Sequence, residues 1–215
     1  MTRTKVLMAA LTAALLLSLG AGTAAALRSL SVVGETTVTL NSRRLTFENG
    51  SSIICEVTMI KTISRVIPKR FPILIGGVRD IRTASCTSPL GTPAPPRFLN
   101  LNTATDWRII ADGFQGRLPG IEGLRARIEK SHTLFEIRTF LGTVNCLYSG
   151  EIDGLVHISP TTGKVEFLET IRVDNLILDN ANGLNSGSCG ATGHFTATGT
   201  EGRLNDLTAY TVKLV

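Results

Sequence analysis

Apolar and polar residues alternate along much of the chain, which is the pattern of strands with one buried and one exposed face. The clearest alternation runs over Ser52–Ile63 and follows Asn49-Gly50, a dipeptide typical of tight hairpin turns. The alternate residues Ile53, Cys55, Val57 and Met59 are apolar, so their side chains would share one face of the strand. We therefore predict a strand over Ser52–Ile63, preceded by a strand over Arg43–Phe47 and by a first strand or extended arm over Leu30–Leu40.

The stretch Asp106–Gly150 contains the only tryptophan of the chain, Trp107. Its apolar residues alternate within segments that are separated by glycines, so we predict a meander of short strands at the centre of the domain. Trp107 shares its parity with two further apolar residues, Ile109 and Ala111. We therefore expect Trp107 to be largely buried.

Further strands are predicted on both sides of this meander. Before it, Ile73–Val78 indicates a strand bent at two glycines and continued by Asp80–Cys86. The proline-rich connection Thr87–Pro96 is excluded from a sheet interior, because proline lacks the N–H that pairing requires. After the meander, the predicted strands are Glu151–Ile158, Lys164–Val173, His194–Thr200 and Thr208–Val215, with a loop over Asp179–Gly193.

About ten strands and no amphipathic helix predict an all-β fold, either an antiparallel β-sandwich or a barrel. Residues 27–215 are enough for one well-buried domain. Residues 1–26 have the parts of a secretory signal peptide: basic Arg3 and Lys5, an apolar segment over Val6–Leu19 and a small-residue cleavage site at Ala24-Ala25-Ala26. The apolar segment is shorter than the ~20 residues of a membrane-spanning helix. We therefore expect export, with a mature chain that begins near Leu27 and has no transmembrane segment.

Charge adds little to this picture. Without the leader the chain has 20 basic and 17 acidic residues, a net charge of +3, and these residues are interspersed. The one basic cluster, Arg65–Arg70, lacks the length and the interleaved aromatics of a nucleic-acid site. We expect no nucleic-acid partner.

All four cysteines, Cys55, Cys86, Cys146 and Cys189, follow the leader, and an oxidising compartment allows disulfides to persist. No C-x-x-C pair indicates a metal site. Three pairings are open. We expect Cys55–Cys86 and Cys146–Cys189, because each bridge then joins a strand to a segment one or two hairpins later.

Candidate chemistry is sparse. The three histidines, His132, His157 and His194, fall on different predicted strands or strand edges. Three acids, Glu151, Asp153 and Glu166, are close enough in a predicted hairpin to suggest glycoside hydrolysis, but nearby Lys164 and Arg172 favour cross-strand ion pairs. The loop Asp179–Gly183 lacks both anchor ligands of an EF-hand. We therefore assign no catalytic residue, no metal ligand and no cofactor.

Four segments carry a resemblance to a known group: C-E-V-T-x at Cys55–Met59, D-W-x-x-x-x-D-G-F-x-G-x-L-P-x-I at Asp106–Ile121, C-L-Y-x-G at Cys146–Gly150 and G-x-F-T-A-T-G-T at Gly193–Thr200. With its leader, the chain resembles a loose group of uncharacterised secreted bacterial proteins. The resemblance implies export and an all-β, disulfide-bearing fold, and it brings no established activity.

Three functions follow as hypotheses. The first is a non-catalytic, secreted or envelope-associated protein that acts by binding or structural interaction with a cell-envelope component or another protein. The second is a barrel that carries a small apolar ligand and needs an internal cavity. The third is a secreted hydrolase that uses Glu151, Asp153 and Glu166. A filled core favours the first, a large apolar cavity the second, and acids converging in a groove the third.

Overall fold

The computed structural model of this protein is built from strands. It describes residues 29–34, 36–48, 52–101, 105–117, 120–164, 169–180, 183, 185–187, 189–203 and 210–214, and no helix occurs among them. The strands are β1 (Leu30–Val33), β2 (Thr37–Glu48), β3 (Ser52–Ile63), β4 (Val66–Ile67), β5 (Ile73–Thr87), β6 (Thr92–Pro93), β7 (Arg97–Phe98), β8 (Arg108–Arg117), β9 (Gly120–Thr139), β10 (Gly142–His157), β11 (Glu169–Leu178), β12 (Thr192–Arg203) and β13 (Thr211–Leu214). The predicted leader lies outside the described residues.

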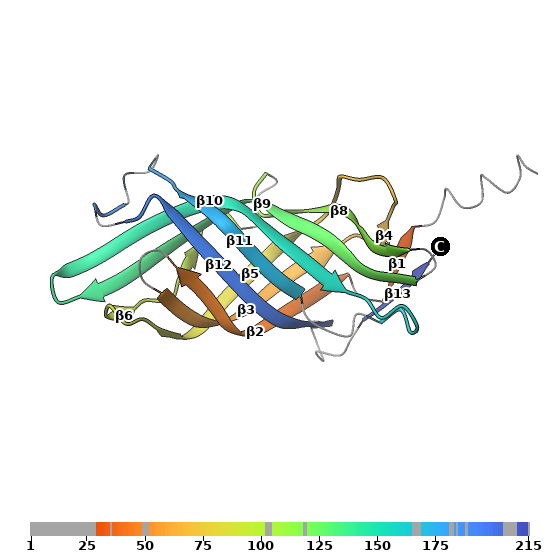
Figure 1. Ribbon diagram of the computed structural model, residues 1–215, viewed down its shortest axis with the longest axis horizontal. Helices are drawn as coiled ribbons and strands as arrows, with labels where there is room; N and C mark the ends of the chain where they lie inside the picture. Colours follow the sequence, from red (N-terminus) through yellow and green to blue (C-terminus); the bar gives the residue numbers. More distant parts are fainter. Residues whose placement is uncertain are drawn as a thin grey trace, which may run out of the picture.

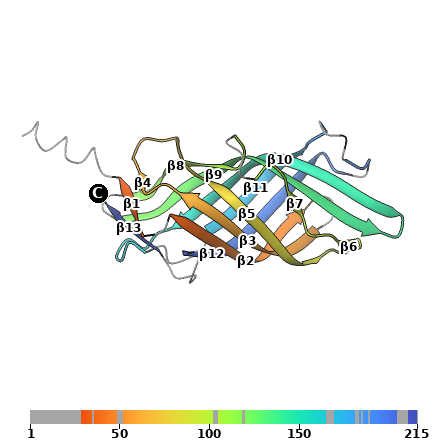
Figure 2. The same cartoon turned by 180° about the vertical axis from the view of Figure 1, so that it is seen from behind.

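Eight long strands pair in a closed antiparallel ring. Seven of the eight pairings join consecutive long strands, in the order β2, β3, β5, β8, β9, β10, β11 and β12. The eighth pairing, between β12 and β2, closes the ring. The fold is therefore an antiparallel barrel, elongated and with strongly inclined strands in both views (Figure 1, Figure 2). Its opposite walls pack through their inner side chains as the two sheets of a sandwich do.

A small second sheet lies at one end of the ring. Strand β1 pairs on one side with β13 and on the other with β4. This sheet is at the right of Figure 1, at the opposite end from the β9–β10 hairpin turn. Because Leu30, Val32, Ile67 and Val212 are buried, the small sheet closes this end of the barrel with apolar side chains.

The prediction for Ser52–Ile63 is confirmed, since β3 has these bounds and its burial alternates along its length. The residues before it behave differently from the prediction. Leu30–Leu40 is not one strand: the chain leaves β1 at Gly34, whose φ is 93°, and β2 then runs without interruption from Thr37 to Glu48. The predicted turn at Asn49-Gly50 lies outside the described residues, but Glu48 pairs with Ser52 as a hairpin there requires.

The central meander exists, but its strands are long, so the prediction of short segments was wrong. Strand β10 continues from Gly142 through Gly150 and Gly154 to His157, and therefore includes most of the separately predicted strand Glu151–Ile158. Glycines inside these strands coincide with register shifts instead of turns, as between Gly150 and Ile152. Partners on both sides of each strand hold it in extended conformation despite the glycines.

The predicted bend in β5 is confirmed. Gly76 faces β3 so closely that a Cβ there would lie 1.8 Å from the Thr62 carbonyl oxygen, and the register shifts at this point. Glycine is therefore required for β3 and β5 to approach. The proline-rich segment pairs more than expected, because Thr92 and Pro93 lie along the edge of β9. This agrees with the exclusion of proline from sheet interiors only.

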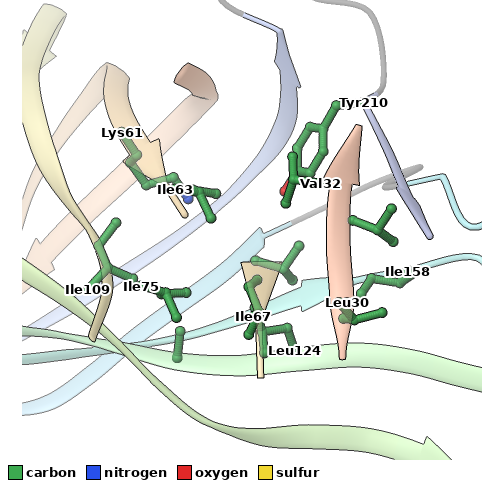
Figure 3. Close-up of a pocket in the computed structure, with 13 residues that line it drawn as sticks. Leu30, Val32, Lys61, Ile63, Ile67, Ile75, Ile109, Leu124, Ile158 and Tyr210 are labelled. Carbon is green, nitrogen blue, oxygen red and sulfur yellow. The ribbon is translucent and has the colours of Figure 1, made fainter. Parts of the chain in front are cut away.

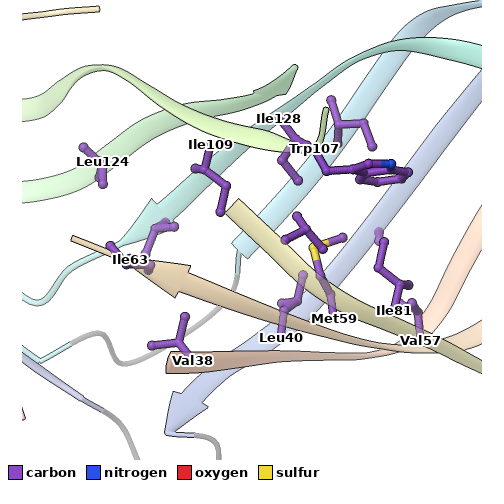
Figure 4. Packing of buried hydrophobic residues seen from close by; sticks show 14 of the residues in the cluster. Val38, Leu40, Val57, Met59, Ile63, Ile81, Trp107, Ile109, Leu124 and Ile128 are labelled. Atoms are coloured by element: carbon purple, nitrogen blue, oxygen red, sulfur yellow. The ribbon is translucent and has the colours of Figure 1, made fainter. Parts of the chain in front are cut away.

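Buried apolar side chains from all eight long strands fill the interior, and Figure 4 shows part of this packing. Trp107 is 1% exposed, which confirms the predicted burial, although it lies just before β8 and not within a strand. Its Nε1–H donates to the Leu99 carbonyl at 2.7 Å, and its ring meets Phe98 edge to face at 5.8 Å between centroids. The indole is therefore both packed and hydrogen-bonded, as a buried tryptophan requires.

A second aromatic group bridges the interior nearer the β9–β10 turn. Phe47 stacks on Phe135 at 3.8 Å between ring centroids, and Tyr148 packs against both. The Tyr148 hydroxyl donates to the Gly190 carbonyl at 3.0 Å. Gly193 makes room for this group, because a Cβ there would lie 2.6 Å from the Phe47 ring.

Both expected disulfides are present. Cys55 bonds Cys86, with Cα atoms 4.1 Å apart, and Cys146 bonds Cys189, with Cα atoms 5.7 Å apart. The first joins neighbouring strands β3 and β5, and the second ties the segment before β12 to β10. Closing loops of 31 and 43 residues stabilises the fold by about 4 kcal/mol each on the chain-entropy model.

Candidate binding site at the apolar end

Two of the three acids that suggested hydrolysis, Glu151 and Asp153, are exposed on the outer wall beside arginines. Glu151 is 3.6 Å from Nε of Arg127 across the β9–β10 pair, and Asp153 is in register with Arg127 on one side and Arg172 on the other. Glu166 lies outside the described residues. The geometry therefore supports cross-strand charge pairing for Glu151 and not a pair of free acids converging in a groove.

Arg127 is the centre of a wider charge cluster on this wall. Its guanidinium donates to Asp112 and, at 3.1 Å, to Glu129, which also accepts a 2.8 Å hydrogen bond from Arg108. The hydrogen bond from Arg108 lowers the pKa of Glu129. Burial acts in the opposite direction, but the hydrogen bond from Arg127 also lowers the pKa, and the net shift is downward. Burial opposes the charge of Arg127, but its hydrogen bonds to Asp112 and Glu129 outweigh burial and raise its pKa. Both shifts stabilise the charged forms, which suits a structural ion-pair network.

The histidines do not come together. His132 on β9 is in register with Ser149, His157 on β10 with Gly123, and His194 on β12 with Glu48. His132 lies near two carboxylates, with Asp106 and Asp179 each 3.8 Å from one of its ring nitrogens. Among the described residues, no group of three histidine, cysteine or acidic side chains has the geometry to hold a metal ion.

An apolar cavity lies where the small sheet closes the barrel (Figure 3). Leu30 and Val32 approach it from β1, Tyr210 from the position just before β13, and Ile63 and Leu124 from the barrel. Its volume is about 30 Å³. Because one water molecule needs roughly 10–15 Å³ of cavity volume, the cavity has room for a few water molecules and not for a carried ligand.

One wall of the cavity contains a buried ion pair that the sequence reasoning missed. Lys61 Nζ lies 2.7 Å from Glu201 Oε1, with side chains 4% and 0% exposed. The Tyr210 hydroxyl lies 3.1 Å from Glu201 Oε2 and donates to it. The alternation of each strand already indicated that both side chains face inward. Lys61 falls on one of the alternate positions of β3 that are buried, and Glu201 does the same in β12.

The opposite end of the barrel exposes apolar side chains. We define the apolar end as Leu90, Phe140 and Leu141. Phe140 is 95% exposed and Leu141 84%, the largest values for big apolar residues in the described chain, and both form the turn between β9 and β10. Leu90 is 58% exposed in the 88–91 turn, and the next residue, Gly91, packs against the Arg138 carbonyl on β9. Figure 1 shows this hairpin extending beyond the other strands at the left.

The hairpin that presents Phe140 and Leu141 is braced on both edges. Along β9, Ala94 N–H donates to the Glu136 carbonyl and Leu99 N–H to the His132 carbonyl. Along β10, the Ser186 N–H donates to the Asn145 carbonyl at 2.8 Å, and the Leu147 N–H donates to Asn185 Oδ1 at 2.6 Å. These contacts cover the hairpin edges, so the side chains of the turn are what the hairpin offers to a partner.

Comparison with known proteins gives no relative: no protein-family model, curated protein or solved structure matches the chain. The described part of the chain has no helix of the length and apolar character needed to cross a membrane.

Proposed function

We propose that this chain is a non-catalytic, secreted or envelope-associated protein that acts by binding, and that the apolar end is its binding surface. The observation that carries the proposal is the exposure of Phe140 and Leu141 at the turn of a braced hairpin. Exposed apolar side chains that form one contiguous patch are a mark of interaction surfaces, whether for a protein or a membrane. The two disulfides support an oxidising compartment, as does the leader sequence.

The alternative of an apolar-ligand carrier has less support from the geometry. Ligand pockets usually have volumes of several hundred Å³, and the space under the small sheet is about 30 Å³. A carried ligand would have to displace Leu30, Val32 and their neighbours from the barrel end. The filled interior instead favours binding through the outer surface.

The proposal is tested by retention on the cell-envelope fraction of the source organism. We expect wild-type protein to co-sediment with envelopes. In Phe140→Ser/Leu141→Ser the affinity for envelopes should fall at least about tenfold, because two large apolar side chains are no longer buried on binding. Ile177→Ser is the matched control, since Ile177 is a 62% exposed apolar residue on β11. Equal retention of wild type and the double variant, or loss with Ile177→Ser alone, contradicts the proposal.

A further inference from the structure

The apolar end has the chemistry of a surface that enters a lipid layer. We propose that Phe140, Leu141 and Leu90 insert into the interfacial region of a phospholipid bilayer, so that the barrel is held peripherally at a membrane; this rests on the proposed function. Shape is the first reason. A projecting turn enters a fluid apolar layer without a matching pocket, whereas three side chains are far fewer than the roughly 20–30 residues per side of a stable protein interface.

The backbone of the turn is the second reason. A hairpin that leaves water must satisfy its polar backbone groups internally, because the lipid layer offers few partners. Thr139 does this locally: its Oγ1 accepts from the Leu141 N–H at 3.2 Å and donates to the Gly142 carbonyl at 2.9 Å. Gly142 has a φ of 129°, which a residue with a side chain rarely adopts. The turn is thus closed by hydrogen bonds while its two apolar side chains point outward.

The flanking strands are the third reason. The β9 edge near the turn is occupied by 92–99, and the β10 edge is bonded to 185–186 from Asn145 onward, which restricts edge pairing with another chain. A tip-first contact remains. This contact requires a rigid support, and the disulfide Cys146–Cys189 supplies one close to the turn, where Cys146 is in register with Phe135.

Charge around the tip is the fourth reason. The two segments that form this end, 87–98 and 136–145, contain two arginines, Arg97 and Arg138, and one acidic residue, Glu136. Both arginines are exposed, and Arg138 also contacts Glu136 from its Nε at 3.2 Å. Arg138 lies two residues from Phe140, whereas Arg97 is farther from the turn, in register with Leu134. A basic group beside an apolar insertion suits anionic headgroups, and one arginine near the membrane surface strengthens binding about fivefold.

The test is sedimentation of exported protein, its mass checked for loss of residues 1–26, with vesicles of phosphatidylcholine alone or with phosphatidylglycerol. We expect binding to anionic vesicles, weakened at least about tenfold in Phe140→Ser/Leu141→Ser and unchanged in Ile177→Ser. Arg97→Gln/Arg138→Gln should abolish the preference for anionic vesicles and keep the residual binding to neutral ones. Circular dichroism spectra equal to wild type establish that each variant is folded.

Absence of wild-type binding to both vesicles, or equal binding of wild type and the Phe140 and Leu141 double variant, overturns the lipid proposal. Retention on envelopes that depends on Phe140 and Leu141, without binding to vesicles made from the extracted envelope lipids, also overturns it. In that last case the proposed function stands and the partner at the apolar end is a protein or another envelope component.

Discussion

Trp107 is the largest side chain of the barrel interior, and its indole combines full burial with a hydrogen bond to Leu99. We predict that Trp107→Ala lowers the free energy of unfolding by about 3–5 kcal/mol, because it leaves a large cavity. Trp107→Phe should cost less, since it keeps an aromatic ring beside Phe98. Urea unfolding followed by circular dichroism measures both changes. A cost below about 1 kcal/mol for Trp107→Ala would show that the indole does not support the core.

Lys61 and Glu201 form the other residue-scale feature with a clear expectation. Removing one partner of a buried ion pair leaves an uncompensated charge, so Lys61→Met should destabilise the protein by about 3–5 kcal/mol. Lys61→Met/Glu201→Gln removes both charges and keeps an acceptor for the Tyr210 hydroxyl, so it should regain most of this loss. Comparing the single variants and the double variant in urea checks the coupling. A double variant no more stable than Lys61→Met would contradict it.

Burial of single residues was predictable where alternation was strict. Trp107 and the predicted inward residues of β3 have the expected burial. Phe140 and Leu141 were not predictable, because an apolar pair beside a glycine has the same pattern whether a neighbouring wall covers it or not. The Lys61–Glu201 ion pair could not be predicted, because each residue has to be known to lie near the other. Only the closed ring brings them together, by placing β3 and β12 on the two sides of β2.

Among the elements, the pair β8–β9 carries the charge cluster of Arg108, Arg127 and Glu129. Its pKa shift gives a pH dependence. The folded pKa of Glu129 is below its ordinary value of 4.5, so its stabilisation is present above the unfolded pKa and is lost as the pH falls through the folded pKa. We predict that Glu129→Gln is less stable than wild type at neutral pH, that the difference shrinks as the pH falls below the ordinary glutamate pKa of 4.5, and that it vanishes only below the lowered folded pKa.

Unfolding in urea between pH 7 and pH 2 measures this dependence, with Glu122→Gln as control because Glu122 is an exposed glutamate on the same strand. The control should follow wild type through the acid range. A constant difference between Glu129→Gln and wild type at every pH would show that the substitution acts through packing and not through the charge of Glu129.

The existence of most elements could be predicted, whereas their lengths could not. Ser52–Ile63 has no interior glycine and alternates to its ends, so its bounds were recoverable from the sequence. In Gly142–His157 the glycines at 150 and 154 have the local signal of turns, and only pairing with β9 and β11 keeps the strand extended. The two-residue strands β4 and β6 exist because a neighbouring strand offers an edge, which no local pattern records.

For the molecule as a whole, the sequence left sandwich and barrel open because local alternation predicts strands and their faces but not which distant strands pair. The decisive pairing joins β12 to β2, for example Phe195 with Phe47, across most of the chain. The same closure fills the interior and leaves the two ends as the distinctive surfaces. One end is closed by the small sheet, and the other carries the exposed turn of Phe140 and Leu141.

The apolar end is the proposed binding surface, and the end with β1, β4 and β13 is the closed, structural end of the barrel. Hydrogen exchange of the exported protein, measured by mass spectrometry with and without its own envelope fraction, tests this assignment most directly. We predict that envelopes slow exchange in peptides covering 88–98 and 137–145 and leave peptides covering β1, β4 and β13 unchanged. Protection confined to β1, β4 and β13, or no protection anywhere, would contradict the account.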